Sequence, residues 1–459
     1  MSATTRQPRV GVWATEIEGA FVVCRAPLMR WIAVLIASLL VAGCVGMIDA
    51  RAPLPQDLVD SARVPGLDGI RAWGDEVPED LIKELNRRFP NVKRIGRFAS
   101  RQDGRPIIEV LALSGGGPNG AFGAGLLSGW TKSGRRPEFE IVTGVSAGAL
   151  IAPFAFLGPE YDETLREIWT TYETNQLVKP SGLPGLLGGD SLVDTTPLAE
   201  LIARYLNRKV LDEIAREYRR GRLLMVLTTN LDAQRPVVWN MGELAARRTP
   251  AATELFHKVV LASAAIPGIF PPVRVTVEAD GKTFDELHVD GGVTRQLFVT
   301  PVEAPISEFN RFYETPPIHR IYVIENGKPA PIYAPVEQKT LPLVGQSIIS
   351  LLRAQASAEL YQVFRRVRDA NADFFYAAIP VQFPFRPAEA FDKRYQKKLY
   401  EAGEAQGRSR QPWARIPPQL VPTARRPKPV ATRPVGPRRS GAAVSSGSNF
   451  FSALSGSDK

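Results

Sequence analysis

Apolar runs alternate along this chain with stretches in which apolar residues recur at helical spacing. Strands are predicted at residues 107–113, 139–143, 223–230, 235–239, 318–324 and 374–379, and helices at 79–85, 121–130, 147–156, 162–172, 197–205, 249–261, 346–369 and 391–404. Because a helix between two strands returns the chain to the end of the sheet where the first strand began, the next strand can run parallel to it. This order of elements predicts an α/β fold. We expect three layers, α/β/α, around a mostly parallel central sheet.

The first 43 residues have the pattern of a targeting segment, which is kept apart from the fold. An uncharged apolar run at 31–41 leads into Val41-Ala42-Gly43-Cys44. This sequence resembles the lipobox of bacterial lipoproteins. A start at Met29 gives a more compact leader than a start at Met1, so we expect translation to begin there. The resemblance implies lipidation of Cys44 and export to the bacterial cell envelope, at the outer membrane facing the periplasm.

An uncleaved membrane anchor is the alternative interpretation of the apolar run at 31–41. A helix that spans a bilayer needs about 20 apolar residues, and this run is shorter, which favours the lipoprotein prediction. Cys24 and Cys44 are the only cysteines in the sequence. After cleavage, Cys44 would be the only cysteine left, and no intramolecular disulfide could form.

The net charge of +10 is concentrated at the two ends of the chain. Residues 424–459 carry +6 and residues 1–43 carry +2, which leaves +2 for residues 44–423. The central part is close to neutral, so its charge gives no reason to expect binding to nucleic acid. The tail at 411–459 is basic and rich in Pro, Arg and Ser, a composition typical of disordered segments.

Three glycine-rich motifs follow predicted strands. Residues 114–120, Ser-Gly-Gly-Gly-Pro-Asn-Gly, come between a strand and a helix of small residues. Residues 144–148, Gly-Val-Ser-Ala-Gly, fit G-x-S-x-G, a strand–turn–helix arrangement that exposes a serine hydroxyl. Residues 290–292, Asp-Gly-Gly, follow a later strand. A nucleotide-binding loop would need Gly-Lys-Ser/Thr after the first motif, and this chain has none there.

The motifs, together with residues 262–268 (Ala-Ser-Ala-Ala-Ile-Pro-Gly), closely resemble those of the patatin-like phospholipase family over residues 107–303. The resemblance implies a patatin-like fold and hydrolysis of acyl esters in phospholipids or related lipids. It also implies a catalytic dyad in which Ser146 is the nucleophile and Asp290 accepts its proton. No cofactor and no metal are expected, since no acidic cluster has the spacing of metal ligands.

A serine hydroxyl attacks an ester only when a nearby base takes its proton. His257 lies inside a predicted helix, His288 precedes Asp290 by two residues, and His319 begins a strand. Sites in parallel α/β sheets lie at the carboxyl ends of strands, so His319 is at the wrong end. No histidine fits, and Asp290 becomes the predicted base, in surroundings that raise its pKa above about 3.9. The other interpretation of Asp290 is a turn residue in an Asp-Gly hairpin.

Ester hydrolysis places negative charge on the carbonyl oxygen, so hydrogen-bond donors must already point at that atom. Backbone N–H groups of the first glycine motif are predicted to form this oxyanion hole, at Gly115, Gly116, Gly117 and Gly120. The other motif glycines are expected to permit tight backbone turns: Gly144 and Gly148 at the serine, and Gly291 and Gly292 beside it.

Asn119 stands where the family usually has lysine or arginine. A positive charge near the head group or the oxyanion would be missing, which puts head-group preference and turnover in question. This departure motivates a second hypothesis, a catalytically weak lipid-binding or scaffolding lipoprotein of the envelope. A third hypothesis is an esterase with a serine triad that uses His319.

These predictions divide the chain into five parts: a lipoprotein signal peptide at 1–43, a tether with a docking helix at 44–104, a catalytic domain at 105–330, a C-terminal helical extension at 331–410, and a basic tail at 411–459. The expected partners are an acyl-lipid substrate and, through Cys44, a membrane. The glycine-rich loop at 181–190 has two interpretations, a plain surface loop or a mobile flap over a lipid-binding cleft.

Overall fold

A computed structural model of the chain describes residues 51–76, 101–181, 191, 193–299, 306–307, 310, 315–333, 335–422, 428 and 430–435. The predicted leader with Cys44, the helix at 79–85, and most of the loop at 181–190 and of the tail at 411–459 lie outside these residues. The chain divides into two units, Met1–Ala52 and Pro53–Lys459, and the second contains every element described below.

The central sheet follows the predicted arrangement of strands. Its order is β1 (Arg71–Trp73), β8 (Arg235–Asn240), β7 (Leu223–Asn230), β4 (Ile141–Val145), β3 (Arg105–Leu113), β11 (Ile318–Glu325) and β12 (Asp373–Ala378). The five strands from β7 to β12 are parallel. β8 runs antiparallel to them, and β1, antiparallel to β8, runs in their direction again. The hairpin of β9 (Val273–Ala279) and β10 (Lys282–Asp290) joins the sheet at β7. A mostly parallel sheet is confirmed.

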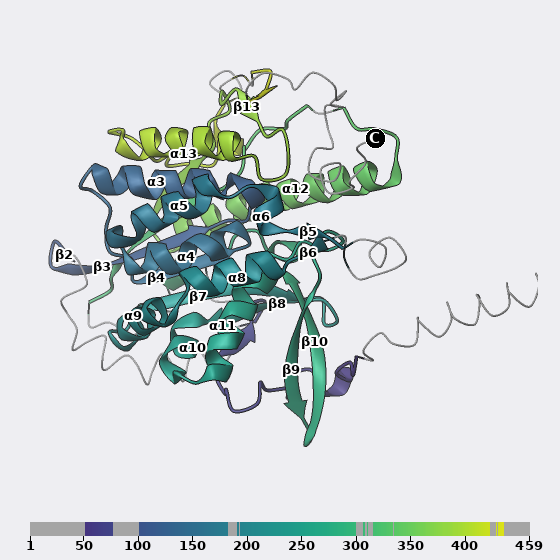
Figure 1. The fold of residues 1–459 in the computed structure, drawn as a ribbon. Helices are drawn as coiled ribbons and strands as arrows, with labels where there is room; N and C mark the ends of the chain where they lie inside the picture. The colour runs from purple at the N-terminus through teal and green to yellow at the C-terminus, as the bar shows by residue number, and fades with distance from the viewer. Residues whose placement is uncertain are drawn as a thin grey trace, which may run out of the picture. The chain divides into compact units, whose positions relative to one another are not determined.

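Side chains of β3 alternate between two hydrophobic cores, one on each face of the sheet. Leu111 and Leu113 belong to the larger core, which is covered by α3 (Gly120–Lys132) and α4 (Ala147–Leu157). Val110 and Ala112 belong to the other core, to which α12 (Thr340–Asp369) contributes Leu360, Val363, Phe364 and Val367. The result is the predicted three-layer α/β/α architecture (Figure 1).

The remaining helices are α5 (Asp162–Thr171), α6 (Thr174–Leu177), α8 (Thr196–Tyr205), α9 (Arg208–Arg219), α10 (Met241–Arg247), α11 (Pro250–Ser263) and α13 (Lys393–Arg408). The remaining strands are short: β2 (Arg101–Gln102), β5 (Lys179–Pro180), β6 (Val193–Asp194), β13 (Phe385–Arg386) and β14 (Arg433–Pro434). Sequence reasoning did not predict α9, α10 or β9. Among the described residues, no helix is long and apolar enough to cross a membrane.

The predicted boundary at residue 330, between the catalytic domain and the C-terminal extension, does not divide the sheet and its helical layers into separate units. The segment predicted as a C-terminal extension supplies α12 to the second helical layer, β12 to the edge of the sheet, and α13, which packs against α3. Figure 1 shows α13, α3 and α5 side by side on one side of the sheet. The segment predicted as a tether also contributes, because β1 pairs with β8. Residues from both flanks therefore complete the layers around the motif core.

Candidate active site

The register of β7 brings Ser146 and Asp290 together. β4 pairs with β7 as far as Val145, which lies opposite Leu227. β10 pairs with β7 from the next residue onward, with Asp290 opposite Thr228. Because β8 occupies the other side of β7, β4 and β10 lie end to end on the same side. Ser146, the residue after β4, therefore meets Asp290 at the carboxyl end of the parallel strands.

Ser146 lies in a sharp turn between β4 and α4. Its backbone angles, φ 53° and ψ −121°, are rare for a residue other than glycine and are typical of a strained functional position. A Cβ atom on Gly144 would lie 2.5 Å from the carbonyl oxygen of Gly148, and one on Gly148 would lie 2.3 Å from that of Leu113. Only glycine fits at either position, and the turn has the strand–elbow–helix geometry that G-x-S-x-G predicts.

Asp290 has the environment of a general base. It is 5% exposed, its Oδ1 accepts the N–H of Gly292 at 2.7 Å, and its carboxylate accepts a hydrogen bond from the Ser146 hydroxyl. Burial raises the pKa of Asp290 from 3.8 to about 7, and the two hydrogen bonds oppose only part of that rise. A buried carboxylate with this pKa is a stronger base than an exposed aspartate and can take the proton of Ser146 near neutral pH.

The three histidines have other partners. His257 Nε2 lies 2.9 Å from the carbonyl oxygen of Leu206, and His319 Nε2 lies 2.9 Å from Asn310 Oδ1. His288 is fully buried, with its ring nitrogens 2.9 Å from Thr228 Oγ1 and 3.0 Å from Glu286 Oε2. Burial lowers the pKa of His319 to about 4. Among the described residues, no group of three or more His, Cys, Asp or Glu side chains could hold a metal ion.

The glycine loop offers backbone N–H groups to an oxyanion. Within the described residues, the N–H groups of Gly116 and Gly117 have no hydrogen-bond acceptor. The N–H of Ala147, directly after Ser146, begins α4 and so has no partner in the helix. Each well-placed donor of this kind contributes about 2.7–4 kcal/mol to stabilisation of the transition state.

Gly115 and Gly120, also predicted as oxyanion donors, have different roles. The N–H of Gly120 donates to two carbonyl oxygens within its own turn. A Cβ atom on Gly120 would lie 2.2 Å from the Trp169 ring, so this glycine makes room for the indole. The N–H of Gly115 points to the carbonyl oxygen of Gln296 at 3.4 Å. The predicted donor set is therefore too large, because both of these N–H groups already have acceptors.

Asn326 holds the glycine loop in place, although nothing in the sequence marked it. It is 1% exposed; its Nδ2 donates to the Ser114 carbonyl oxygen at 2.9 Å, and its Oδ1 accepts the Gly123 N–H at 3.1 Å. Asn326 directly follows β11, so its side chain connects the end of that strand with the loop after β3. An Asn-Gly pair between polar residues is typical of an exposed turn, which is why its sequence context did not indicate this role.

Gln296 and Glu359 support the turn that carries Asp290. Gln296 Nε2 donates to the carbonyl oxygen of Gly292 at 3.2 Å. Glu359 Oε2 accepts the backbone N–H groups of Gln296 at 2.7 Å and Leu297 at 2.9 Å, and burial raises the pKa of Glu359. Because Glu359 belongs to α12, the second helical layer fixes the backbone that follows the Asp-Gly-Gly motif.

Ser263, in the motif at residues 262–268, contacts the turn that carries Ser146. Its Oγ accepts the N–H of Ser146 at 3.0 Å and donates to the carbonyl oxygen of Leu227 at 2.6 Å. The same carbonyl oxygen would lie 2.4 Å from a Cβ on Gly291, so that glycine permits the close approach of the Asp290 turn. Through these two hydrogen bonds, Ser263 connects the turn at Ser146 with β7 at the point where β4 ends.

Asn119 takes part in an internal contact. The Tyr395 hydroxyl, on α13, donates to Asn119 Oδ1 at 2.7 Å. Tyr395 is 4% exposed, and burial raises its pKa well above the usual range, so it remains a neutral donor. The carboxamide thus attaches the glycine loop to α13, and lysine or arginine could not accept this hydrogen bond because their side chains have no acceptor.

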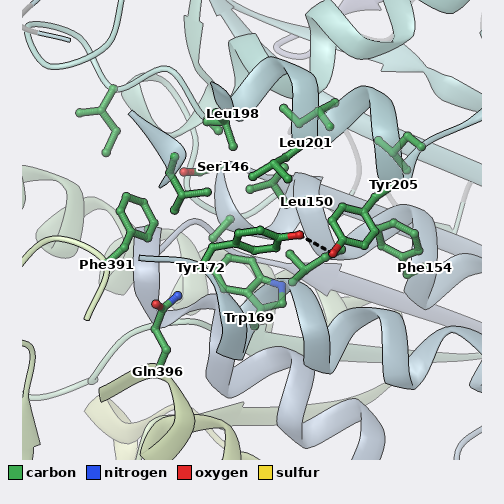
Figure 2. A pocket seen from close by; sticks show the side chains of 18 residues that line it. Ser146, Leu150, Phe154, Trp169, Tyr172, Leu198, Leu201, Tyr205, Phe391 and Gln396 are labelled. Carbon is green, nitrogen blue, oxygen red and sulfur yellow. Dashed lines mark hydrogen bonds between the residues drawn. The ribbon is translucent and has the colours of Figure 1, made fainter. Parts of the chain in front are cut away.

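An apolar pocket opens at Ser146 (Figure 2). Its walls come largely from α4, α5 and α8, with Leu150 and Leu198 among them. Trp169 Nε1 and Gln396 Oε1 belong to lining residues, are buried and have no hydrogen-bond partner within the described residues. A pocket with an apolar lining and few polar atoms is suited to a lipid chain with a polar group at one end.

A serine in a nucleophile elbow, beside free backbone donors and an apolar pocket, defines the class of lipid acyl hydrolases. Residues 111–303 match the model of the patatin-like phospholipase family. This part of the chain is a patatin-like phospholipase domain, as the motifs indicated.

Two solved structures are similar to the chain. VipD from Legionella pneumophila shares 13% identity, with a TM-score of 0.34, over 68% of this chain and 70% of that one. The human GIVD cytosolic phospholipase A2 shares 13% identity, with a TM-score of 0.29, over 68% of this chain and 52% of that one. A comparison with curated proteins finds no match.

Proposed function

We propose that the protein hydrolyses acyl esters of phospholipids or related lipids through a Ser146–Asp290 dyad. Asp290 takes the proton of Ser146 as its Oγ attacks the ester carbonyl, and the N–H groups of Gly116, Gly117 and Ala147 stabilise the oxyanion. When the tetrahedral intermediate collapses, Asp290 gives the proton to the leaving alcohol and Ser146 keeps the acyl group. Water then attacks the acyl-enzyme and gives a proton to Asp290. The bond between the acyl carbon and Ser146 Oγ breaks, Asp290 returns the proton to Oγ, and the fatty acid leaves.

One observation carries this proposal: the Ser146 hydroxyl donates to a buried carboxylate whose pKa is about 7, at the mouth of an apolar pocket. The register of β4 and β10 on β7 supports it, because that register brings the two side chains together. The unpartnered polar atoms of Trp169 and Gln396 also support a ligand site, since a buried donor or acceptor without a partner is costly unless a ligand satisfies it.

Product analysis tests the proposed reaction. The full-length protein, kept soluble in detergent, is incubated with mixed phospholipids and with neutral acyl esters, and released fatty acids are measured by mass spectrometry. We expect hydrolysis by the wild type and none by Ser146→Ala, which should also lose labelling by a fluorophosphonate probe. Labelling that survives in Ser146→Ala would contradict the assignment of the nucleophile. Lipid binding without turnover in the wild type would favour the scaffolding hypothesis instead.

We further propose that lipid on Cys44 holds the enzyme at a bacterial membrane, with the catalytic unit in the periplasm. The apolar run at 31–41 followed by Val41-Ala42-Gly43-Cys44 supports this proposal. Several acyl chains give nearly irreversible attachment, at about 0.8 kcal/mol per buried methylene. Cys44→Ser is expected to abolish incorporation of a labelled fatty acid and to move the protein out of the membrane fraction, whereas Cys24→Ser should change neither. Equal incorporation in wild type and Cys44→Ser would refute the anchor.

A further inference from the structure

The pocket at Ser146 extends along one face of α4. Ser146 caps that helix, and Leu150 and Phe154, four and eight residues later, also line the pocket. At 1.5 Å of rise per residue, this path is ~12 Å long. Figure 2 shows Ser146 on one side of the pocket and Phe154, beside Tyr205, on the other. The pocket therefore has a reactive end at Ser146 and a far end at Phe154.

Two tyrosines meet at the far end of the pocket. The hydroxyl groups of Tyr172, which follows α5, and Tyr205, the last residue of α8, lie 2.7 Å apart. Tyr205 donates its own proton to Glu167 Oε1 at 2.8 Å, so Tyr172 must be the donor to Tyr205. Both rings are half-buried, whereas Glu167 is exposed. The hydroxyl pair thus connects the residue after α5 with the end of α8 in the pocket lining, and its hydrogen bonds continue to an exposed carboxylate.

We infer that the Tyr172–Tyr205 pair closes the pocket and sets the length of the acyl chain that it accepts. The inference rests on the proposed function, because it assigns the chain of the substrate to this pocket. An extended hydrocarbon advances ~1.3 Å per carbon for a C–C bond of ~1.5 Å, so the path from Ser146 holds roughly nine carbons. A medium-length acyl group fills it, and a longer one must displace a tyrosine ring to continue toward solvent.

A series of p-nitrophenyl esters, from butanoyl to hexadecanoyl, tests this inference. In the wild type, kcat/KM is expected to peak near octanoyl or decanoyl and to fall about tenfold or more at hexadecanoyl, as expected when surplus methylenes do not fit a pocket. Tyr172→Ala and Tyr205→Ala open the far end, and the optimum should move to longer chains. Tyr205→Phe keeps the ring and loses only the hydrogen bonds, so a smaller shift in the same direction is expected.

Tyr161→Phe is the matched control. The Tyr161 hydroxyl also donates to a carboxylate, that of Glu213, but Tyr161 does not line the pocket. This variant should keep the chain-length preference of the wild type. Alkyl fluorophosphonates of the same lengths give a second measurement that needs no turnover, and their rates of labelling Ser146 should follow the same order.

The two proposals fail in different ways. If the wild type hydrolyses all chain lengths equally, or if Tyr172→Ala and Tyr205→Ala keep the optimum of the wild type, the closure by the tyrosine pair is refuted while hydrolysis by Ser146 stands. If no ester is hydrolysed and no fluorophosphonate labels Ser146, the proposed function is refuted and this inference with it.

Discussion

Asp290→Asn is expected to lower kcat/KM for ester hydrolysis by about 10⁴-fold, the order seen when a catalytic carboxylate is replaced by its amide. The asparagine oxygen can still accept the Gly292 N–H, so the turn is preserved, but it cannot take a proton from Ser146. The wild type should lose activity as the pH falls through about 7, because its base becomes protonated. The residual activity of the variant should lack this inflection. Rates with a neutral ester between pH 5 and pH 9 check both expectations.

The same substitution is expected to stabilise the protein above pH 7. Burial raises the pKa of Asp290 from 3.8 to about 7 in the folded state, so the folded state binds this proton more tightly than the unfolded state. The resulting stabilisation is complete below pH 3.8 and is lost as the pH rises through 7. At 1.36 kcal/mol per unit of pKa, the ionised carboxylate lowers the free energy of unfolding by up to about 4 kcal/mol. Urea unfolding of both proteins should differ more at pH 8 than at pH 5.

Glu140→Gln is the matched control for Asp290→Asn. Burial also raises the pKa of Glu140, to about 8, but this residue directly precedes β4 and lies at the opposite end of that strand from Ser146. Its amide variant should gain stability at high pH and keep its hydrolytic rate. Activity of Asp290→Asn within tenfold of the wild type would rule out Asp290 as the base, whatever its effect on stability.

The central sheet was predictable because buried parallel strands contain near-continuous apolar runs. β3, β7 and β11 each contain a run of apolar residues, at 110–113, 223–227 and 321–324, and the elbow motif spans the end of β4. That Ser146 and Asp290 lie close together could be predicted only from the resemblance to the patatin-like phospholipase family. It depends on β10 pairing with the last three residues of β7, and no local pattern specifies which residues of two distant strands lie opposite each other.

The residues that position the backbone of the site could also not be predicted, and the physical reason is different. Asn326, Gln296 and Glu359 are buried polar residues, yet residues of these types are mostly exposed, so their burial follows only from the tertiary arrangement. The helical pattern at 346–369 correctly predicted most of α12. A helical pattern defines an apolar face but does not identify the surface that the face covers, which is why α12 was predicted as an extension and not as a layer of the fold.

The sequence also provided no indication that the backbones of α3 and α13 are in contact. This contact predicts a large effect of a substitution on folding stability. Gly125 and Gly129 on α3 face Gly403 and Gly407 on α13. A Cβ atom on any of the four would lie 2.1–2.2 Å from a backbone carbonyl oxygen of the opposite helix. A side chain at these positions must push the helices apart, because the backbone of a packed helix cannot give way as a flexible side chain can. Since α13 also carries Tyr395 and Gln396, the same contact positions Tyr395 against the glycine loop and Gln396 in the pocket lining.

Gly403→Val is therefore expected to lower the free energy of unfolding by about 3 kcal/mol or more, the upper range for an overpacked core. In a free helix, replacing glycine would increase stability by a few tenths of a kcal/mol, so a net loss reports the helix contact itself. Ala405→Val places the same side chain on the exposed face of α13 and should change stability by less than about 0.5 kcal/mol. Urea unfolding measures both variants. Equal midpoints for them would show that α13 is not held against α3 by backbone contact at these glycines.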